Sequence, residues 1–376
     1  MKEKLACPKC HGQLKKNESG FSCLVCRKNY LADEYLDFSS STVNDWEQLT
    51  EEQYQELFDN YEKMDWQSAL TKTLLKHWNQ YLVDYNTSPE RYLFVDEVLA
   101  KHVDLSQKEV LEIGCSFGNM SRKLAQRSRS VVAVDTPKNV IKWLLAMKNK
   151  DGIDNLYPLR IDNLDYSFLP FRDESFDVVV LGMTLQWVGT SSAKESPDAI
   201  QQRLLKDIFR VLKRGGVLCF FDKNRYSYSY LINEPDPSTL MYASFLPRRI
   251  ADLYVQLMSR ISGMNNKKYF RFVKDVTLAS SRYRNYRHCF IHIKKMIGWA
   301  GFSRINFYLP LPAVRFQKLF IPLDNEKAGE RLFARWFDRF VKELKGHPIV
   351  RLIFKLSLKL RLSRYLADGY LIIAKK

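Results

Sequence analysis

Four cysteines near the start of the chain stand in two pairs with the spacing of a metal site. Cys7 and Cys10 form the first Cys-x2-Cys pair, and Cys23 and Cys26 form the second. Each pair places two sulfurs on one tight turn, and two such turns complete the tetrahedral thiolate shell that zinc prefers. Disulfides or a redox-active pair are the alternatives, but no secretion signal precedes the pairs and neither lies in a βαβ context. The pattern predicts a structural zinc ion, because four protein ligands leave no open position.

A second group of residues has the spacing of a nucleotide-binding turn. Gly114 and Gly118 flank a short turn after the apolar stretch 109–113, and Asp135 ends the next apolar stretch. A glycine there lets the backbone turn sharply and leaves room for a ligand. A carboxylate about 20 residues further on can accept hydrogen bonds from both ribose hydroxyls. A dehydrogenase would show the same two features, so this pattern alone does not choose the cofactor.

The elements that must position these residues alternate between strand and helix. Such an order predicts a doubly wound α/β sheet, in which ligands bind at the carboxyl ends of the strands. The expected strands are 109–113, 130–134, 156–161, 176–181 and 217–221, and the expected helices are 119–126, 138–148 and 200–212. A further helix at 289–299 and strands at 304–309 and 369–374 follow after interruptions. Residues 223–288 and 310–368 are therefore interpreted as insertions.

Several motifs in this order resemble those of the class I S-adenosylmethionine-dependent methyltransferases, with a core of the methyltransferase type 11 kind. They occupy residues 111–118, 132–135, 161–164, 169–171, 173–177, 185–188 and 211–216. The resemblance covers 105–222 in detail and extends to the final strands. A dehydrogenase would not show the later motifs. The family usually has a third glycine in the first loop, where this chain has the small residue Ser116. The resemblance implies a Rossmann-like sheet of seven strands, the last of them antiparallel.

The resemblance also implies roles for individual residues. Glu112 and Gly114 would lie against the methionine part of S-adenosyl-L-methionine, Asp135 against the ribose and Asp162 against the adenine amine. The residues expected at the cofactor are Glu112, Gly114, Ser116, Gly118, Asp135, Asp162, Asn163, Leu181 and Gly182. The candidates for the acceptor pocket are Trp187, Arg225 and Tyr226, with Asp222 as a candidate base for a hydroxyl acceptor. Trp187 is equally compatible with a core position.

Other polar residues have more ordinary interpretations. Asp173 and Glu174 are expected in a turn, and a cap of its own strand is the ordinary interpretation of Asp177. His288 and His292 open a predicted helix from which they could reach inward, although a lone histidine is more often structural.

Positive charge is concentrated in the last third of the chain. The 376 residues carry a net charge of +17, yet residues 241–376 hold 28 basic against 8 acidic side chains, a net of +20. Residues 1–240 hold 31 against 34, a net of −3. Such asymmetry favours an anionic partner: RNA, an anionic lipid surface or a phosphate-bearing small molecule. Basic and aromatic side chains interleave at 267–287, and 348–366 is a basic, leucine-rich stretch expected to be helical, with peripheral membrane contact as one alternative to packing.

These features divide the chain into seven regions. They are a zinc ribbon (1–38), a helical linker (39–105), the cofactor-binding core (106–222), a basic cap insertion (223–288), a core helix and sixth strand (289–309), a second basic insertion (310–368) and a final strand (369–376). Because both insertions leave the carboxyl ends of strands, we expect a mainly helical cap over the acceptor site. No apolar run of membrane-spanning length occurs, and all seven cysteines suit a reducing cytoplasm.

Three functions remain open at this point. The ribbon resembles the small zinc-ribbon activator subunit of certain tRNA and protein methyltransferases, which favours an RNA methyltransferase that grips phosphates with ribbon and cap. The same module is fused to many methyltransferases of small molecules, which favours an anionic small-molecule or glycan-precursor acceptor. The second of these is the preferred prediction. A scaffold that binds S-adenosylmethionine without catalysis is the third.

Overall fold

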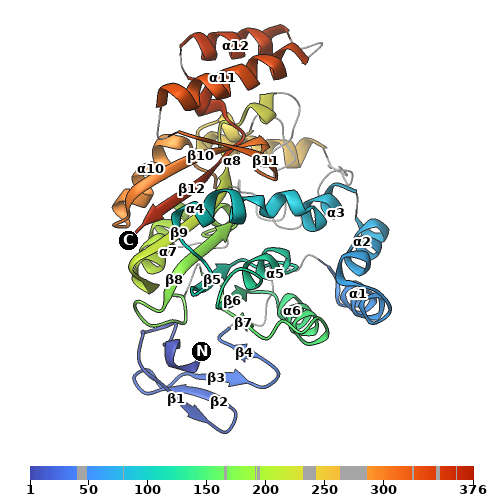
Figure 1. Ribbon diagram of the computed structural model, residues 1–376, viewed down its shortest axis with the longest axis vertical. Helices are drawn as coiled ribbons and strands as arrows, with labels where there is room; N and C mark the ends of the chain where they lie inside the picture. The colour runs from blue at the N-terminus through green and yellow to red at the C-terminus, as the bar shows by residue number, and fades with distance from the viewer. Residues whose placement is uncertain are drawn as a thin grey trace.

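A single sheet runs the length of the molecule (Figure 1). The computed structural model describes residues 1–39, 49–78, 80–164, 167–190, 192, 195–231, 243–262, 286–323, 326–343, 348–360 and 362–376. Within these residues twelve strands form one sheet in the order β1-β2-β3-β4-β7-β6-β5-β8-β9-β12-β10-β11. The α/β class predicted from the alternating pattern is confirmed.

The predicted core strands are consecutive in this sheet. They are β5 (Glu109–Ile113), β6 (Ser130–Asp135), β7 (Leu156–Arg160), β8 (Phe176–Gly182), β9 (Leu212–Lys223), β10 (Ser303–Ala313) and β12 (Gly369–Lys375). The first five pair in parallel, and β12 lies antiparallel between β9 and β10. The sheet exceeds the seven expected strands because four strands, β1 to β4, extend one end and β11 extends the other.

Helices cover both faces of the sheet and bury two apolar cores. The side chains of Val110, Val178 and Val180 face one core, and those of Leu111, Val179 and Leu181 face the other, as the two-residue period of a strand requires. The first core contains α1 (Glu51–Lys63), α2 (Trp66–His77), α5 (Asn119–Ala125) and α6 (Lys138–Lys150). The second contains α7 (Pro197–Val211) and α10 (Phe290–Trp299).

The segment before β5 is helical, as predicted for 39–105. After α1 and α2 come α3 (Gln80–Thr87), the short helices η2 (Pro89–Tyr92) and η3 (Val95–Leu99), and α4 (Ala100–His102). Thr50 begins α1 with a capping box, in which its side chain accepts from the main chain of Gln53 and its own main-chain N–H donates to the Gln53 side chain. This segment runs along the same face as α5 and α6 (Figure 1).

Two strands differ from the sequence expectation. β9 begins at Leu212 instead of Val217, because its first residues pair with β8 through an irregularity that Gly215 accommodates with a φ of +74°. The second insertion opens with a hairpin, since β10 continues to Ala313 and β11 (Phe316–Pro322) pairs back onto it. Pro310 and Pro312 lack an N–H group to donate. They are tolerated there because β10 pairs with β12 only as far as Tyr308, so no hydrogen bond to β12 is lost beyond that residue.

The N-terminal ribbon is joined to the main sheet. Its strands are β1 (Leu14–Asn17), β2 (Gly20–Cys23), β3 (Asn29–Ala32) and β4 (Leu36–Asp37). β4 pairs in parallel with β7, and Arg160 on β7 forms a 3.0 Å ion pair with Asp37 on β4. Phe21, Tyr30 and Phe38 are buried in the same core as α7. The ribbon therefore extends the sheet of the core and shares its interior.

The two insertions contact each other at the opposite end of the sheet (Figure 1). The first contains η5 (Tyr228–Leu231), η6 (Ala243–Phe245) and α8 (Arg248–Ser262), and the second contains α11 (Glu326–Glu343), α12 (Pro348–Lys359) and η8 (Ser363–Leu366). The Tyr228 ring lies 6.3 Å from Trp336 and 5.8 Å from Phe337, between ring centroids. Of the basic and aromatic stretch 267–287, residues 267–285 lie outside the described part of the chain. No helix in the described residues is long and apolar enough to cross a membrane.

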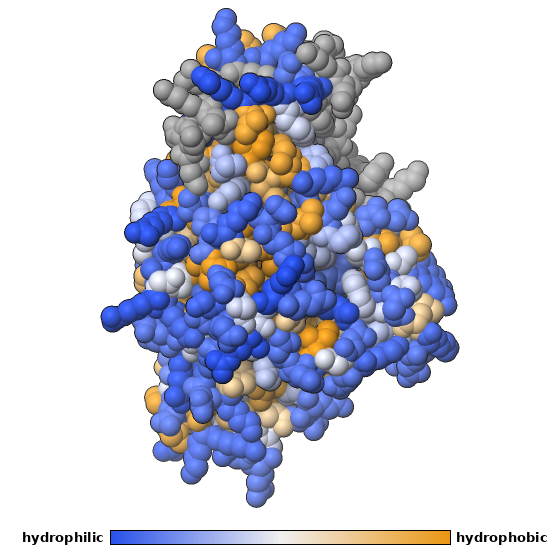
Figure 2. Space-filling view, in the orientation of Figure 1, coloured by the Kyte–Doolittle hydropathy of each residue, from blue (hydrophilic) through white to orange (hydrophobic). Residues whose placement is uncertain are grey.

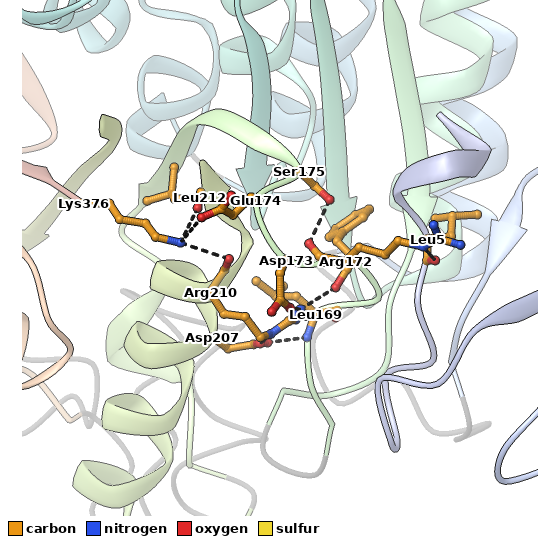
Figure 3. A network of polar contacts seen from close by, with 11 residues as sticks. Leu5, Leu169, Arg172, Asp173, Glu174, Ser175, Asp207, Arg210, Leu212 and Lys376 are labelled. Atoms are coloured by element: carbon orange, nitrogen blue, oxygen red, sulfur yellow. Dashed lines mark hydrogen bonds and ion pairs between the residues drawn. The ribbon is translucent and has the colours of Figure 1, made fainter. Parts of the chain in front are cut away.

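A polar network closes the amino end of the core strands (Figure 3). Arg210 on α7 bonds to the Asp207 and Asp173 carboxylates at 2.7 and 2.9 Å, and Asp207 accepts from the main chain of Leu169. Arg172 donates to the Leu5 carbonyl and Lys376 to the Leu212 carbonyl. Asp173 and Glu174 lie in the turn expected for them. The network ties the ribbon, α7 and the C-terminus together, far along the strands from the glycine turn.

Candidate functional site

The turn after β5 requires three residues with positive φ. Gly114 has a φ of +79° and Gly118 one of +78°, while Ser116 between them has one of 47°. A Cβ on Gly114 would lie 2.2 Å from Oγ1 of Thr184, so a side chain does not fit there. Ser116, at the position where the family usually has glycine, adopts the left-handed region at a cost of about 1–3 kcal/mol. The predicted sharp turn is therefore present, with the helix α5 starting at Asn119.

Asp135 lies beside this turn because β6 is the neighbour of β5. The Asp135 carboxylate accepts from the main-chain N–H of Ser116 through Oδ2 at 2.9 Å and from that of Thr136 through Oδ1 at 2.8 Å. Burial raises the pKa of Asp135, and these two N–H donors oppose the shift. Each oxygen keeps a second lone pair, so the carboxylate can still accept hydrogen bonds from a ligand.

A pocket opens over the turn. Of the predicted cofactor residues, it brings together Glu112, Gly114, Ser116 and Gly182. Cys115, Phe117, Asn119 and Met120 complete its floor on the α5 side. Gly182 is needed as glycine, because a Cβ there would lie 2.7 Å from the Phe221 ring on β9.

Three lining residues come from the helical segment before β5 and were not predicted. They are Asn86 on α3 and Arg91 and Tyr92 on η2. Arg91 donates to the carbonyl and the hydroxyl of Tyr85 and covers its ring, which fixes the guanidinium above the pocket. A helical region was predicted here, but nothing in the sequence indicated that it folds back over the glycine turn, because such contacts leave no spacing pattern.

Three buried polar atoms at this pocket have no hydrogen-bond partner among the described residues. They are Oε1 of Glu112, Oδ1 of Asn119 and Nε of Arg91. Glu112 is fully buried, and its other oxygen accepts from Ser121 at 2.5 Å. Burial raises the pKa of Glu112 to about 8. Buried polar groups are almost always paired, so these three atoms require a partner in the pocket, such as a water molecule or a polar ligand.

The other predicted cofactor residues lie outside this pocket lining. Asp162 and Asn163 follow β7, and Asp162 accepts from the main chain of Asn163 at 3.0 Å. Gly118 immediately precedes α5 and lies close to Met147. A Cβ on Gly118 would be 2.8 Å from the Met147 side chain. Leu181 is fully buried in the core on the α7 side, so it supports β8 and does not face the pocket.

The candidate acceptor residues cluster where β9 ends. Asp222 directly follows Phe221, whose ring covers Gly182, but the strand alternation turns Asp222 toward the α7 face. There its carboxylate accepts a hydrogen bond from the main-chain N–H of Lys223 at 2.7 Å. Burial raises the pKa of Asp222 to about 6, and the nearby positive charge of Arg287 opposes this shift. Trp187 is half-buried in η4 (Leu185–Trp187) on the same side.

Arg225 and Tyr226 have structural contacts in this arrangement. Arg225 donates to the carbonyls of Ser244 and Leu246, which anchors the first insertion. Tyr226 stacks on Phe245 with 5.8 Å between ring centroids. Both hold the insertion against the core, and Tyr226 remains half-buried at the carboxyl edge of the sheet.

The four N-terminal cysteines converge at a second site. Their sulfur atoms all lie within 4.8 Å of one another, with Cys7 3.6 Å from Cys26 and Cys10 3.5 Å from Cys23, and none is in a disulfide. Tetrahedral zinc–thiolate bonds of about 2.3 Å separate sulfurs by about 3.8 Å, so the group fits that ion. Both turns are built alike: the residue after the pair, His11 or Arg27, has positive φ and donates to the carbonyl of the first cysteine.

Comparison with known proteins identifies the core. Residues 111–220 match the family described as methyltransferase domain. Residues 111–220 therefore form a methyltransferase domain. The matched stretch begins at Leu111 and ends at Phe220, so it contains the glycine turn, Asp135 and the end of β8. The ribbon, the helical segment and both insertions lie outside it.

Three methyltransferases are similar in sequence to this chain. The chain is 26% identical over 148 residues to ubiquinone biosynthesis O-methyltransferase of Pseudomonas entomophila, covering 39% of this chain and 56% of that protein. It is 32% identical over 125 residues to phthiotriol/phenolphthiotriol dimycocerosates methyltransferase 1 of Mycobacterium ulcerans, covering 33% and 40%. It is 24% identical over 215 residues to ubiquinone biosynthesis O-methyltransferase of Coxiella burnetii, covering 54% and 84%. The chain thus spans about half the length of the first two.

Solved structures overlap only loosely with the whole chain. Phosphoethanolamine N-methyltransferase 2 of Haemonchus contortus, in complex with S-adenosyl-L-methionine, gives a TM-score of 0.43 at 15% identity, covering 85% of this chain and 60% of that one. A putative sarcosine dimethylglycine methyltransferase of Galdieria sulphuraria gives 0.41 at 14% identity, covering 78% and 87%.

Proposed function

We propose that this protein transfers the methyl group of S-adenosylmethionine to a small-molecule acceptor. The observation that carries the proposal is the pocket over the glycine turn, where Glu112, Asn119 and Arg91 each present a buried polar atom without a partner. An amino acid end with one ammonium and one carboxylate group would satisfy all three. Glu112 and Asn119 would accept from the ammonium group, and Arg91 would donate to the carboxylate.

The remaining cofactor residues follow from the same placement. Asp135 would accept from the ribose hydroxyls, because its oxygens face the turn and keep free lone pairs. Ser116 and Gly114 would let the ligand lie directly on the backbone. Asp162, with Asn163 beside it, would bond the adenine amine at the end of β7. When bound, S-adenosylmethionine supplies an activated methyl group, so the chain needs chiefly to hold the acceptor in line with it.

We further propose a hydroxyl group as the methyl acceptor. Asp222 stands at the end of β9 with a pKa of about 6, so it is ionised at neutral pH and close enough to neutrality to take a proton. Trp187 and Tyr226, both half-buried at this edge, would border the acceptor. Two of the relatives named above are O-methyltransferases, which agrees with this choice.

The charged, leucine-rich end of the molecule favours an acceptor presented at an anionic lipid surface. On α12, Leu352, Ile353 and Leu356 are exposed by 57%, 38% and 48%, and Lys355 and Lys359 are exposed beside them. Figure 2 shows apolar side chains among strongly hydrophilic ones at this end. Apolar side chains flanked by lysines suit the interface of anionic lipids.

Vesicle binding tests this surface. Full-length protein should co-sediment with phosphatidylglycerol vesicles more than with phosphatidylcholine vesicles, and Leu356→Glu should reduce binding severalfold. Leu75→Glu on α2 is the matched control, because Leu75 is equally exposed at 46% on a remote helix. Equal binding of both variants to the vesicles would show that α12 is not a lipid-binding surface. The proposed methyl transfer does not depend on this result.

Methyl transfer into fractionated extract tests the activity itself. Protein supplied with tritiated S-adenosylmethionine should label the small-molecule or lipid fraction. Label in the RNA fraction would favour the alternative of an RNA methyltransferase. The net charge of +20 on residues 241–376 is consistent with that alternative. Cofactor binding without label in any fraction would leave the scaffold interpretation.

We also propose that the four cysteines hold a structural zinc ion. The sulfur spacing and the paired turns support it. In this role zinc would stabilise the ribbon, which is too small to bury a core of its own, and so keep β4 on the edge of the sheet.

A further inference from the structure

A second group of metal-binding side chains lies between α7 and α10. Oδ1 of Asp198, at the start of α7, is 3.7 Å from Nδ1 of His288 and 3.9 Å from Nε2 of His292. The three ligand atoms lie within 4.8 Å of one another. The imidazole rings stack with 4.7 Å between centroids and an interplanar angle of 17°. One oxygen of Asp198 and one nitrogen of each histidine thus lie close together.

The hydrogen bonds of Gln201 fix which nitrogen of His288 faces Asp198. The Gln201 amide nitrogen lies 2.8 Å from the carbonyl of Leu185 and 3.1 Å from that of Val188, so this end must be the NH2 group. Its Oε1 therefore faces Nε2 of His288, which must donate the proton. In the neutral ring Nδ1 then carries a lone pair, directed at the Asp198 carboxylate.

A lone pair 3.7 Å from a carboxylate oxygen makes no hydrogen bond with it, so the two atoms are both acceptors that a shared cation can bind. His288 is 6% exposed, whereas Asp198 and His292 are 41% and 43% exposed on their side chains, so the cluster is open to solvent from one side. A metal-binding histidine typically donates its other ring N–H to an oxygen, as His288 does to Gln201.

We propose that Asp198, His288 and His292 form a binding site for a divalent transition metal of the zinc type. Bonds of about 2.1 Å at tetrahedral angles place ligand atoms about 3.4 Å apart. The distances from Asp198 to His288 and His292, 3.7 and 3.9 Å, would therefore shorten on metal binding. Three protein ligands leave a fourth position for water or for an oxygen of another molecule. The proposal goes beyond the methyl transfer proposed above and does not depend on it.

Positive charge near the site limits its affinity. Nη2 of Arg248 lies 3.4 Å from the same Asp198 oxygen, and Arg225 and Lys295 add charge around His292. The Arg248 guanidinium therefore competes with the metal for Asp198. Replacing it with an uncharged side chain of similar length should strengthen metal binding.

Metal content of the full-length protein tests this site. At equilibrium in dialysis against buffer with a slight excess of free zinc, elemental analysis corrected for the zinc in the buffer should find about two zinc ions per wild-type chain, one on the thiolates and one here. His292→Ala should retain about one. His102→Ala is the matched control, because His102 is half-buried against Tyr308 away from the cluster, and it should retain both.

Cobalt distinguishes the two sites by spectrum. Cobalt on thiolates gives strong charge-transfer absorption, which His292→Ala should leave unchanged, while the weaker bands from nitrogen and oxygen ligands should be lost. Arg248→Met should tighten binding of this second cobalt ion severalfold. A wild-type chain that binds metal only on thiolates, or a His292→Ala variant with full metal content, would overturn the proposal.

Discussion

The main-chain N–H of Ser116 donates to Oδ2 of Asp135 across 2.9 Å, and this bond ties the turn after β5 to the end of β6. Ser116 must adopt a φ of 47° to point its N–H there. The carboxylate thereby has one orientation before any ligand arrives. A binding group fixed in advance loses less conformational entropy on binding.

Replacing Asp135 with Asn should weaken S-adenosylmethionine binding at least tenfold, about 1.4 kcal/mol. An amide offers one oxygen where two main-chain donors need acceptors, so its NH2 group would face an N–H. Isothermal titration calorimetry measures the effect. Asp104→Asn is the control, because Asp104 also accepts from a main-chain N–H but lies exposed away from the pocket. Equal affinities for the two variants would exclude a role of Asp135 at the ribose.

The stability of the ligand-free protein should depend on pH through Glu112. Burial raises its pKa from 4.5 to about 8, so the folded state holds this proton more tightly than the unfolded state. The stabilisation is complete below pH 4.5 and is lost as pH rises toward about 8. Urea unfolding of wild type and Glu112→Gln between pH 5 and 8.5 should show the free energies of unfolding diverging, with the wild type falling more steeply. Parallel pH profiles would contradict this.

Removing one thiolate should release zinc and loosen one end of the sheet. Cys10→Ser should lose about one zinc ion per chain and lower the thermal midpoint, because the ribbon holds β4 against β7. S-adenosylmethionine affinity should persist in the folded fraction, since β4 and the glycine turn are separated by β7 and β6. Cys289→Ser, outside the cluster, is the control and should keep its zinc. Specific loss of cofactor affinity in a stable Cys10→Ser protein would show that the ribbon belongs to the active site.

Replacing Asp222 with Asn should lower kcat by about 100-fold or more with little change in cofactor affinity, because the amide cannot take the acceptor proton. In the wild type, kcat should fall as pH drops below about 6, the pKa of this carboxyl group. Steady-state rates across pH 5 to 8 with the labelled acceptor fraction measure both. A variant with wild-type kcat would show that the acceptor needs no base or that another group provides it.

The sequence predicted the core well because its signals are local. Strands β5 to β8 begin where apolar runs predicted them, and the neighbourhood of Gly114 and Asp135 follows from a turn and a strand end with fixed spacing. Residues that reach the pocket from elsewhere had no such signal. Asn86 and Arg91 arrive by tertiary folding of the helical segment, which no periodicity reports.

Pairing between distant segments was the other feature that the sequence did not predict. β11 was missed because the expected strand ended at residue 309, whereas β10 continues to Ala313 and pairs with β11 there. The joining of β4 to β7 rests on a two-residue strand, too short to carry a pattern. His288 and His292 could be noted four residues apart, but Asp198, some 90 residues earlier, has no sequence link to them.

Calorimetric titration of S-adenosylmethionine into two glycine variants tests whether the turn after β5 holds this cofactor. Gly114 and Gly152 both have positive φ, +79° and +64°, but a Cβ meets Thr184 at Gly114 and nothing within 4 Å at Gly152. The variants therefore share the backbone strain and differ in the steric clash at the pocket. We predict that wild type and Gly152→Ala bind with the same affinity and that Gly114→Ala, still folded, binds at least tenfold more weakly. Undiminished binding by Gly114→Ala, or no binding by the wild type, would contradict the account.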